Sequence, residues 1–131
     1  MSFPNLENKI VLVVEDDEMS FLYLNQLLLL TRCILFHAIS GSEALEMFRS
    51  QRFDLIFMDI QLPDIDGTLV TREIRLSDQK VPIIAQTAGK TPDDRDKAME
   101  AGCSEVIVKP YSIEQLFEVV AKYTKTGLAG S

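Results

Sequence analysis

Five short apolar runs alternate with segments that have the length and polarity of helices, and this alternation limits the possible folds most strongly. The runs predict strands at residues 10–14, 33–38, 54–58, 81–86 and 105–108. Helices are expected to follow at about residues 18–30, 41–49, 68–76, 92–101 and 113–124. Continuous apolar runs are typical of strands that are buried on both faces of a parallel sheet. The sequence therefore predicts consecutive strand–helix units.

Such units place helices on both faces of one parallel sheet, and right-handed crossovers leave few topologies. We expect an α/β fold, a doubly wound, flavodoxin-like sheet with strand order 2-1-3-4-5 and five helices. One domain is predicted over residues 9–124. Residues 1–8 are expected to be an N-terminal extension and residues 125–131 a C-terminal tail, both frayed.

Local signals support the helix positions. Residues 40–43 and 112–115 each have the spacing of a capping box, with serine at the N-cap and Glu or Gln three positions later. Thr91 precedes Pro92, which is favoured at the first helical position. Gly102 stands where a helix commonly ends in a left-handed residue. These signals predict where three of the helices begin and where one of them ends.

Composition excludes several classes of function. The net charge of −7 opposes binding to a phosphate backbone, so we expect no direct nucleic-acid partner. Cys33 and Cys103 lack the spacing of metal ligands. No apolar stretch is long enough for a membrane span, and residues 1–9 lack a signal-peptide pattern. We therefore expect a cytoplasmic protein that makes no contact with a membrane.

Polar residues follow four of the five predicted strands. Residues 15–17 (Glu-Asp-Asp) follow the first strand, Asp59 the third, Thr87 the fourth and Lys109 the fifth. In open α/β sheets the ligand site lies beyond the carboxyl ends of the strands, near the point where the strand order reverses. These carboxylates, the hydroxyl and the ammonium group are therefore expected to converge on one crevice.

Clustered carboxylates repel one another, and a hard divalent cation relieves that repulsion. We predict a Mg²⁺ site in which Asp16 and Asp59 are direct ligands. Glu15 is expected to act through water, and the backbone carbonyl of Gln61 is expected to reach the same ion.

A carboxylate near such an ion can act as a nucleophile toward phosphorus and form an aspartyl phosphate. Asp59 is the candidate nucleophile. Phosphoryl transfer depends mainly on positioning and charge neutralisation. Lys109 can neutralise charge as a compact ammonium group, and the Thr87 hydroxyl can donate to a phosphoryl oxygen.

Together these motifs resemble the response-regulator receiver family, which the bacterial chemotaxis regulator typifies. The resemblance covers residues 9–123, nearly the whole chain. It is carried by Val-Val-Glu-Asp at 13–16, Met-Asp at 58–59, Leu-Pro-Asp-Ile-Asp-Gly at 62–67, Gln-Thr-Ala at 86–88 and Lys-Pro-Tyr at 109–111. Each motif alone is weak, but their order and separations are specific.

The resemblance implies that Asp59 accepts a phosphoryl group from a histidine kinase or a histidine phosphotransfer protein. It implies that residues 15–16 are the metal-binding acidic pair, Thr87 the switch hydroxyl and Lys109 the phosphate-sensing lysine. It also implies a cis peptide bond before Pro110. Activation in the family reshapes the face made by helix four, strand five and helix five, and a homodimer can form there. The protein would have no separate substrate and would not be an enzyme in the usual sense.

One position departs from the family pattern. The residue three positions before the lysine is often aromatic and rotates inward on activation, whereas here it is Val106. A valine cannot report the signal by a ring movement. The sequences of residues 58–63 and 82–85 resemble those of receivers in hybrid histidine kinases. Kinase domains on the same chain are therefore a further candidate donor.

Two other functions stay in competition. The first is a phosphohydrolase with an Asp nucleophile, which would need a second Asp where this chain has Gln61. The second is a degenerate receiver that acts only as an interaction module, against which the intact acidic residues argue. His37, the one histidine, is predicted to lie in a strand and is not expected to carry phosphate.

Overall fold

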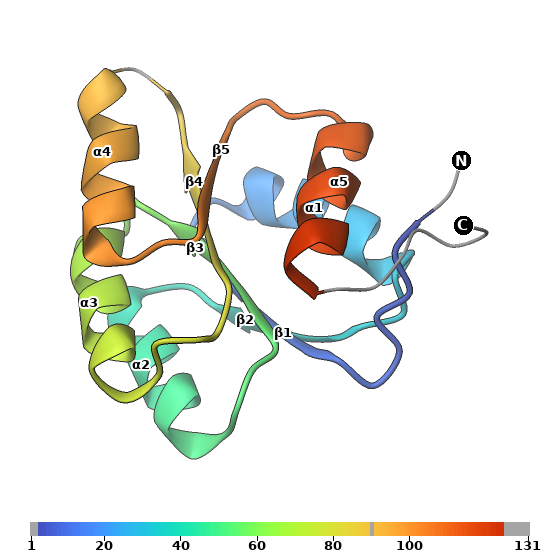
Figure 1. The fold of residues 1–131 in the computed structure, drawn as a ribbon, viewed down its shortest axis with the longest axis horizontal. Helices are drawn as coiled ribbons and strands as arrows, with labels where there is room; N and C mark the ends of the chain where they lie inside the picture. The colour runs from blue at the N-terminus through green and yellow to red at the C-terminus, as the bar shows by residue number, and fades with distance from the viewer. Residues whose placement is uncertain (1–2, 90, 125–131) are drawn as a thin grey trace.

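The computed structural model describes residues 3–89 and 91–124, which form a single parallel sheet with helices on both faces (Figure 1). The strands are β1 (Ile10–Val14), β2 (Ile34–Ala38), β3 (Leu55–Asp59), β4 (Ile83–Thr87) and β5 (Glu105–Val108). The helices are α1 (Glu18–Leu29), α2 (Gly41–Ser50), α3 (Gly67–Ser77), α4 (Pro92–Ala101) and α5 (Ile113–Thr124).

The sheet has the order β2-β1-β3-β4-β5, and all neighbouring strands run parallel. The predicted fold class and strand order are confirmed. From β1 the chain passes first to β2 on one side and later to β3 on the other. The strand order therefore reverses between β1 and β3, where Val14 pairs with Met58. Glu15 and Asp59, the residues that follow this pair, lie side by side at the carboxyl edge of the sheet.

Three strands begin later than the sequence predicts. Strand β2 begins one residue later, at Ile34, and strand β3 also begins one residue later, at Leu55; the Asp54 carboxylate just before β3 accepts a bond of 2.8 Å from the Ile10 N–H. Strand β4 begins at Ile83, because Pro82 has no N–H to donate to a neighbouring strand. Strands β3 and β4 also end one residue later than predicted, so Asp59 and Thr87 are the last residues of their strands rather than the first residues after them.

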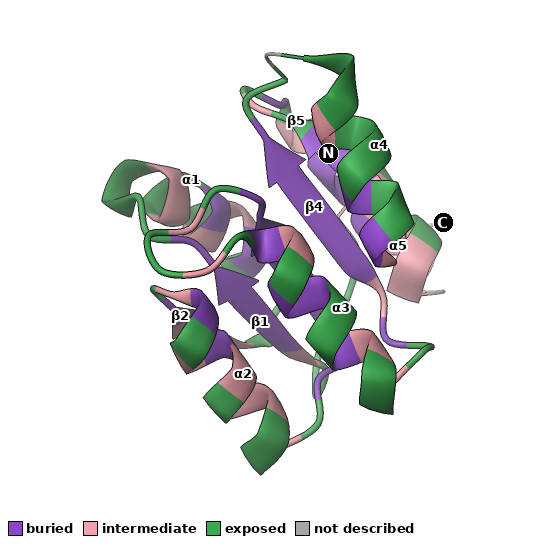
Figure 2. Cartoon of the chain, turned by 90° about the vertical axis from the view of Figure 1, so that its left-hand side faces the viewer, coloured by how far each residue is buried: buried purple, intermediate pink, exposed green. Residues whose placement is uncertain are grey.

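The core has two layers, one on each face of the sheet. Helices α1 and α5 cover one face, and helices α2, α3 and α4 cover the other. Alternate strand residues enter opposite layers: Leu12 and Ile56 contact the three-helix side, whereas Val11 and Leu55 contact the two-helix side. Figure 2 shows strands β1 and β4 buried over most of their length and the helices exposed on their outer faces. This packing holds the strand ends rigidly at one edge.

The predicted helix caps are present, with two differences. Ser112 and Gln115 form a complete capping box, with bonds of 2.8 and 3.1 Å. Ser40 caps α2 through the Glu43 N–H at 3.1 Å, but the Glu43 carboxylate returns to the N–H of residue 39 instead of to Ser40. Thr91 precedes Pro92 in extended backbone without a side-chain cap bond, and Gly102 ends α4 in the left-handed region at φ 114°.

The N-terminal segment Phe3–Asn8 packs against the domain, so the expectation that residues 1–8 are frayed is wrong for this part. Leu6 is fully buried in the layer beneath α1 and α5, and its N–H donates to the Thr31 carbonyl at 2.7 Å. The ring of Phe3 meets that of Phe117 edge to face at 5.8 Å. A single apolar residue in a short irregular segment has no periodicity that would reveal such an anchor. Residues 125–131 lie outside the described part.

Truncation of Leu6 to alanine should lower the free energy of unfolding by about 2–4 kcal/mol, the usual result of removing a buried leucine side chain. Urea denaturation followed by circular dichroism measures this. The control is Glu7→Ala, which removes an exposed side chain whose contact with Arg32 spans 4.0 Å; it should change stability by less than about 0.5 kcal/mol. Equal stability of the two variants would show that the segment is not part of the core.

Candidate functional site

Three carboxylates meet at the carboxyl edge of the sheet. Glu15 and Asp16 follow β1, and Asp59 ends the adjacent strand β3. One oxygen from each lies within 4.8 Å of the others. Glu15 is 1% exposed and Asp59 8% exposed, whereas Asp16 faces solvent. The site therefore has two buried acidic groups and one that opens to water.

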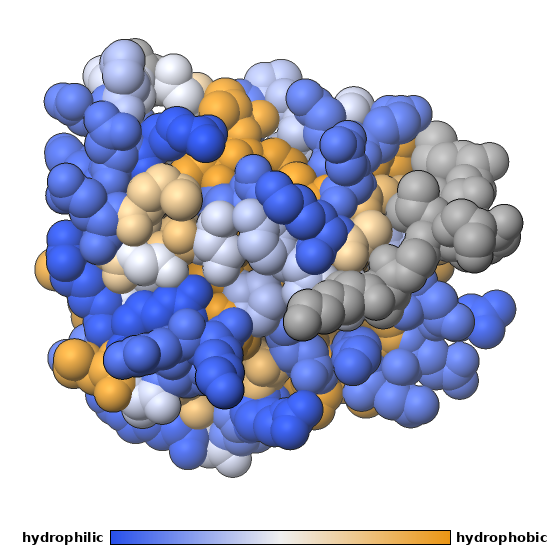
Figure 3. Space-filling model, in the orientation of Figure 1, coloured by the Kyte–Doolittle hydropathy of each residue, from blue (hydrophilic) through white to orange (hydrophobic). Residues whose placement is uncertain are grey.

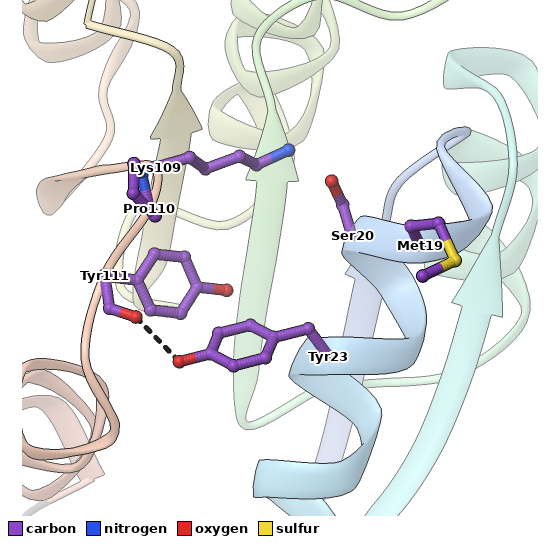
Figure 4. Close-up of a pocket in the computed structure, with 6 residues that line it drawn as sticks. All are labelled: Met19, Ser20, Tyr23, Lys109, Pro110 and Tyr111. Atoms are coloured by element: carbon purple, nitrogen blue, oxygen red, sulfur yellow. Dashed lines mark hydrogen bonds between the residues drawn. The ribbon is translucent and has the colours of Figure 1, made fainter.

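Lys109 reaches this cluster from the far side of β4. Its ammonium group lies 2.5 Å from Glu15 Oε1, and Figure 4 shows the side chain extended across the end of β3. The Lys109 N–H donates to the Thr87 carbonyl at 2.8 Å, and the Lys109–Pro110 peptide bond is cis, as the resemblance implied. The other Glu15 oxygen accepts from the Asp17 N–H at 3.2 Å. Lys109 is therefore paired with Glu15 in this state.

Burial, and after it the hydrogen bond to Glu15 and the repulsion from its carboxylate, raise the pKa of the Asp59 carboxyl to about 8. Two contacts act in the opposite direction: the Gln61 N–H donates to Asp59 Oδ1 at 3.0 Å, and Lys109 supplies positive charge. Without a cation, Asp59 therefore keeps its proton near neutral pH. A nucleophilic carboxylate requires additional positive charge at this site.

The donor set fits Mg²⁺. Oxygen ligands about 2.1 Å from the ion are separated by roughly 3 Å when adjacent and about 4.2 Å when opposite, so oxygens within 4.8 Å need only a small closure to share one ion. When ionised, the three carboxylates and Lys109 have a net charge of −2, which one divalent cation neutralises. The exposed Asp16 leaves room for the waters that Mg²⁺ usually retains.

Thr87 lies at the end of β4 and is 7% exposed. Its hydroxyl donates to Asp94 Oδ2 in the first turn of α4 at 3.3 Å and accepts from the Gly89 N–H at 3.1 Å. The hydroxyl is therefore engaged with α4 in this state. Val106 of β5 is 8% exposed and packs in the three-helix layer, so an aliphatic side chain fills the position that is often aromatic in the receiver family.

Two exposed aspartates of the loop after β3 join it to neighbouring helices. Asp64 accepts from the N–H groups of Gly41 and Ser42 at 2.8 and 3.0 Å, and from the Ser42 hydroxyl at 2.6 Å. These bonds, led by that of the hydroxyl, hold the pKa of Asp64 well below its usual range. Asp66 caps α3 by accepting from the Thr68 N–H at 2.8 Å. Both are exposed, but they join the loop after β3 to helices α2 and α3.

A groove of about 540 Å³ lies beside the acidic cluster, between α1 and the segment after β5 (Figure 4). The hydroxyl of Tyr23 donates to the Tyr111 carbonyl at 2.7 Å across the groove. The lining residues are Met19, Ser20, Tyr23, Lys109, Pro110 and Tyr111. No sequence pattern indicated this groove, because helix periodicity does not show which loop lies opposite α1. Lys109 belongs to both the groove and the acidic cluster.

Replacement of Asp59 by asparagine should stabilise the metal-free protein as the pH rises. The folded-state pKa of Asp59 is raised, so its favourable contribution is complete below about pH 4, the unfolded pKa, and is lost as pH rises through about 8. At pH 9 in EDTA the variant should exceed the wild type by about 1–2 kcal/mol, or roughly 3–8 °C in Tm. Thermal unfolding between pH 5 and 9 checks this.

Saturating MgCl₂ serves as the control for that measurement, because the cation should remove most of the difference by neutralising the wild-type cluster. If the difference in metal-free stability between the wild type and the variant stays constant from pH 5 to pH 9, the assignment of a raised pKa to the buried Asp59 carboxyl is contradicted.

Comparisons with known proteins agree with the geometry. The family model described as "Response regulator receiver domain" matches residues 11–121. A polar-differentiation response regulator from Brucella anthropi is 34% identical, with 88% of this chain and 95% of that protein covered. A hybrid signal transduction histidine kinase from Dictyostelium discoideum is 36% identical over 89% of this chain, which spans 7% of that relative. None of the described helices is long and apolar enough to cross a membrane.

Solved structures have the same fold. The receiver domain of a sensor histidine kinase from Pseudomonas aeruginosa, with a magnesium ion coordinated in its active-site cleft, matches with a TM-score of 0.84 and 30% identity. That match covers 90% of this chain and 98% of the other. A response regulator structure from Chloroflexus aurantiacus matches with a TM-score of 0.87 and 26% identity, covering 91% and 99% of the two chains. The chain therefore belongs to the response regulator receiver domain family of two-component signalling proteins.

Proposed function

We propose that this receiver domain accepts a phosphoryl group on Asp59 from a phosphohistidine donor in the presence of Mg²⁺. The observation that supports the proposal best is the convergence of Glu15, Asp16 and Asp59 with Lys109 at one edge of the sheet. Burial and mutual repulsion both disfavour the ionised forms of clustered carboxyl groups, so such a cluster is best explained by the binding of a cation and a transferred group.

In this proposal Asp16, Asp59 and the Gln61 carbonyl hold the ion directly, and Glu15 acts through water. The bound ion would neutralise charge on the carboxylates and on the transferred phosphoryl oxygens. An Asp59 oxygen forms a bond to phosphorus while the phosphorus–nitrogen bond of the donor breaks, and that electron pair returns to the imidazole nitrogen. The backbone N–H of Gln61, bonded to Asp59 Oδ1, orients the carboxylate for attack through its other oxygen.

The new phosphoryl charge would then change two pairings at the site. Lys109 would exchange its contact with Glu15 for a phosphoryl oxygen, because a doubly charged group attracts the ammonium more strongly. The Thr87 hydroxyl would leave Asp94 and donate to another phosphoryl oxygen, which removes one bond between β4 and α4.

Helix α4 and the adjoining strand β5 and helix α5 would carry the signal outward. Figure 3 shows an apolar patch between α4 and α5 on an otherwise largely hydrophilic face, and Val108 of β5 is 50% exposed. Because Val106 has no ring to rotate, the change here would depend on the Thr87 and Lys109 pairings. This face is also the proposed site of a homodimer formed on phosphorylation.

The proposed donor is a histidine kinase or a phosphotransfer protein, including kinase domains on the same chain. The proposal keeps the cytoplasmic location expected from the sequence, and the chain acts on no separate substrate. A phosphohydrolase is disfavoured, because Gln61 offers an amide where a general acid is needed.

Incubation with acetyl phosphate and Mg²⁺ should add one phosphoryl group, measured by intact mass. The adduct should be absent in EDTA and in Asp59→Asn, because the first lacks the cation and the second lacks the nucleophile. Asp54→Asn is a matched control, since Asp54 directly precedes the opposite end of the same strand and bonds to Ile10 and Arg52. It should be phosphorylated like the wild type.

An adduct that persists in Asp59→Asn would place the acceptor elsewhere, and continued phosphate release from small esters with multiple turnovers would favour the phosphohydrolase. A wild type that binds Mg²⁺ but forms no adduct with acetyl phosphate or with phosphotransfer proteins would favour the interaction module.

Removal of the Asp94 carboxylate should favour the activated state, because the Thr87 hydroxyl loses the partner that holds it toward α4. Asp94→Ala is expected to bind beryllofluoride, a phosphoryl mimic, about 3-fold more tightly, in line with the net value of one hydrogen bond. Titration followed by NMR measures the affinity. Asp96→Ala removes an equal charge from an exposed position of the same helix and should have no such effect.

Unchanged affinity in Asp94→Ala would show that the Thr87–Asp94 bond does not oppose activation.

Sedimentation velocity of the same samples tests the homodimer: the mimic should increase the sedimentation coefficient, and identical profiles with and without it would contradict a phosphorylation-dependent dimer.

A further inference from the structure

A histidine of β2 holds the backbone of the turn that carries two of the carboxylates. His37 Nε2 lies 2.7 Å from the carbonyl oxygen of Glu15. A carbonyl can only accept a hydrogen bond, so Nε2 carries the hydrogen and donates it. The imidazole also stacks on the ring of Phe21 in α1, with centroids 3.5 Å apart and planes 3° from parallel. His37 therefore joins β2, the β1–α1 turn and α1.

The imidazole replaces a missing partner of the sheet. The Glu15 N–H donates to the Ala38 carbonyl at 3.0 Å, which continues the ladder between β1 and β2. In this parallel register the Glu15 carbonyl would next accept from the N–H of residue 40, but β2 ends at Ala38. His37 supplies a donor to that carbonyl from within the strand.

This bond also orients the residue that follows Glu15. The Glu15 carbonyl and the Asp16 N–H belong to one planar peptide unit, so fixing the carbonyl fixes the start of Asp16. Glu15 is then held at its N–H by Ala38, at its carbonyl by His37 and at its side chain by Lys109. Glu15 and Asp16 are thereby placed before any cation binds.

We propose that His37 is a positioning residue that preorganises Glu15 and Asp16 for Mg²⁺. The inference rests on the proposed function, since it assigns His37 to the Mg²⁺ site of that function. Residues that orient metal ligands typically change metal affinity about 10–100-fold when they are replaced.

The test is isothermal titration of the metal-free protein with MgCl₂. His37→Phe keeps a flat ring against Phe21 but removes the donor, and it should weaken Mg²⁺ binding about 10-fold. His37→Gln restores an N–H donor and should recover part of the affinity. Phe36→Leu is the matched control, because Phe36 is the next residue of β2, points into the opposite layer and packs on Phe53. It should alter stability with less than about a 2-fold change in Mg²⁺ affinity.

Hydrogen exchange of the metal-free proteins gives an independent readout. The amides of residues 15–18 should exchange faster in His37→Phe than in the wild type and should be unaffected in Phe36→Leu. If the wild type binds Mg²⁺ and His37→Phe binds it equally well, the positioning role is wrong and the proposed function stands. If the wild type binds no Mg²⁺, the proposed function fails and the role of His37 at a metal site fails with it.

Discussion

Repulsion among carboxylates held at one edge of a rigid sheet is the constraint on which the rest of the structure depends. Two adjacent strands, β1 and β3, end in acidic residues, and the buried layers on both faces prevent them from moving apart. The pKa of Asp59 is raised first by burial and then by the hydrogen bond to Glu15 and the repulsion from its carboxylate. Lys109 relieves part of this repulsion through its contact with Glu15, and in the proposed function a bound cation would relieve more of it.

The residues that relieve the repulsion also connect the site to the surface. Lys109 contacts Glu15 and also lines the groove beside α1. A change of partner at its ammonium group would therefore alter the lining of that groove. Thr87 bonds to Asp94 of α4, so a change of partner at its hydroxyl would remove a hydrogen bond from that helix. In the proposed function the site would therefore communicate with two different faces through the pairings of Lys109 and Thr87 rather than through a rotating aromatic ring.

Much of the fold could be predicted because its signals are local. Apolar runs without alternation indicate buried parallel strands, and the capping box at 112–115 has the predicted bonds. Errors arose where one side chain acts outside its own element. Leu6 was expected to lie in a frayed end although it is fully buried, and no local pattern indicated that the exposed Asp64 caps the N-terminus of α2. Neither residue has a sequence neighbour that predicts its distant partner.

The sequence by itself determined which chemical groups end the strands, and therefore that carboxylates, a hydroxyl and an ammonium group would meet, because parallel strands of a doubly wound sheet all end at the same edge. The tertiary structure decided how those groups pair: Lys109 with Glu15, Thr87 with Asp94, and the Glu15 carbonyl with His37. Such pairings depend on loop paths and ring orientations that are set by packing between distant segments, which no local pattern of residues encodes.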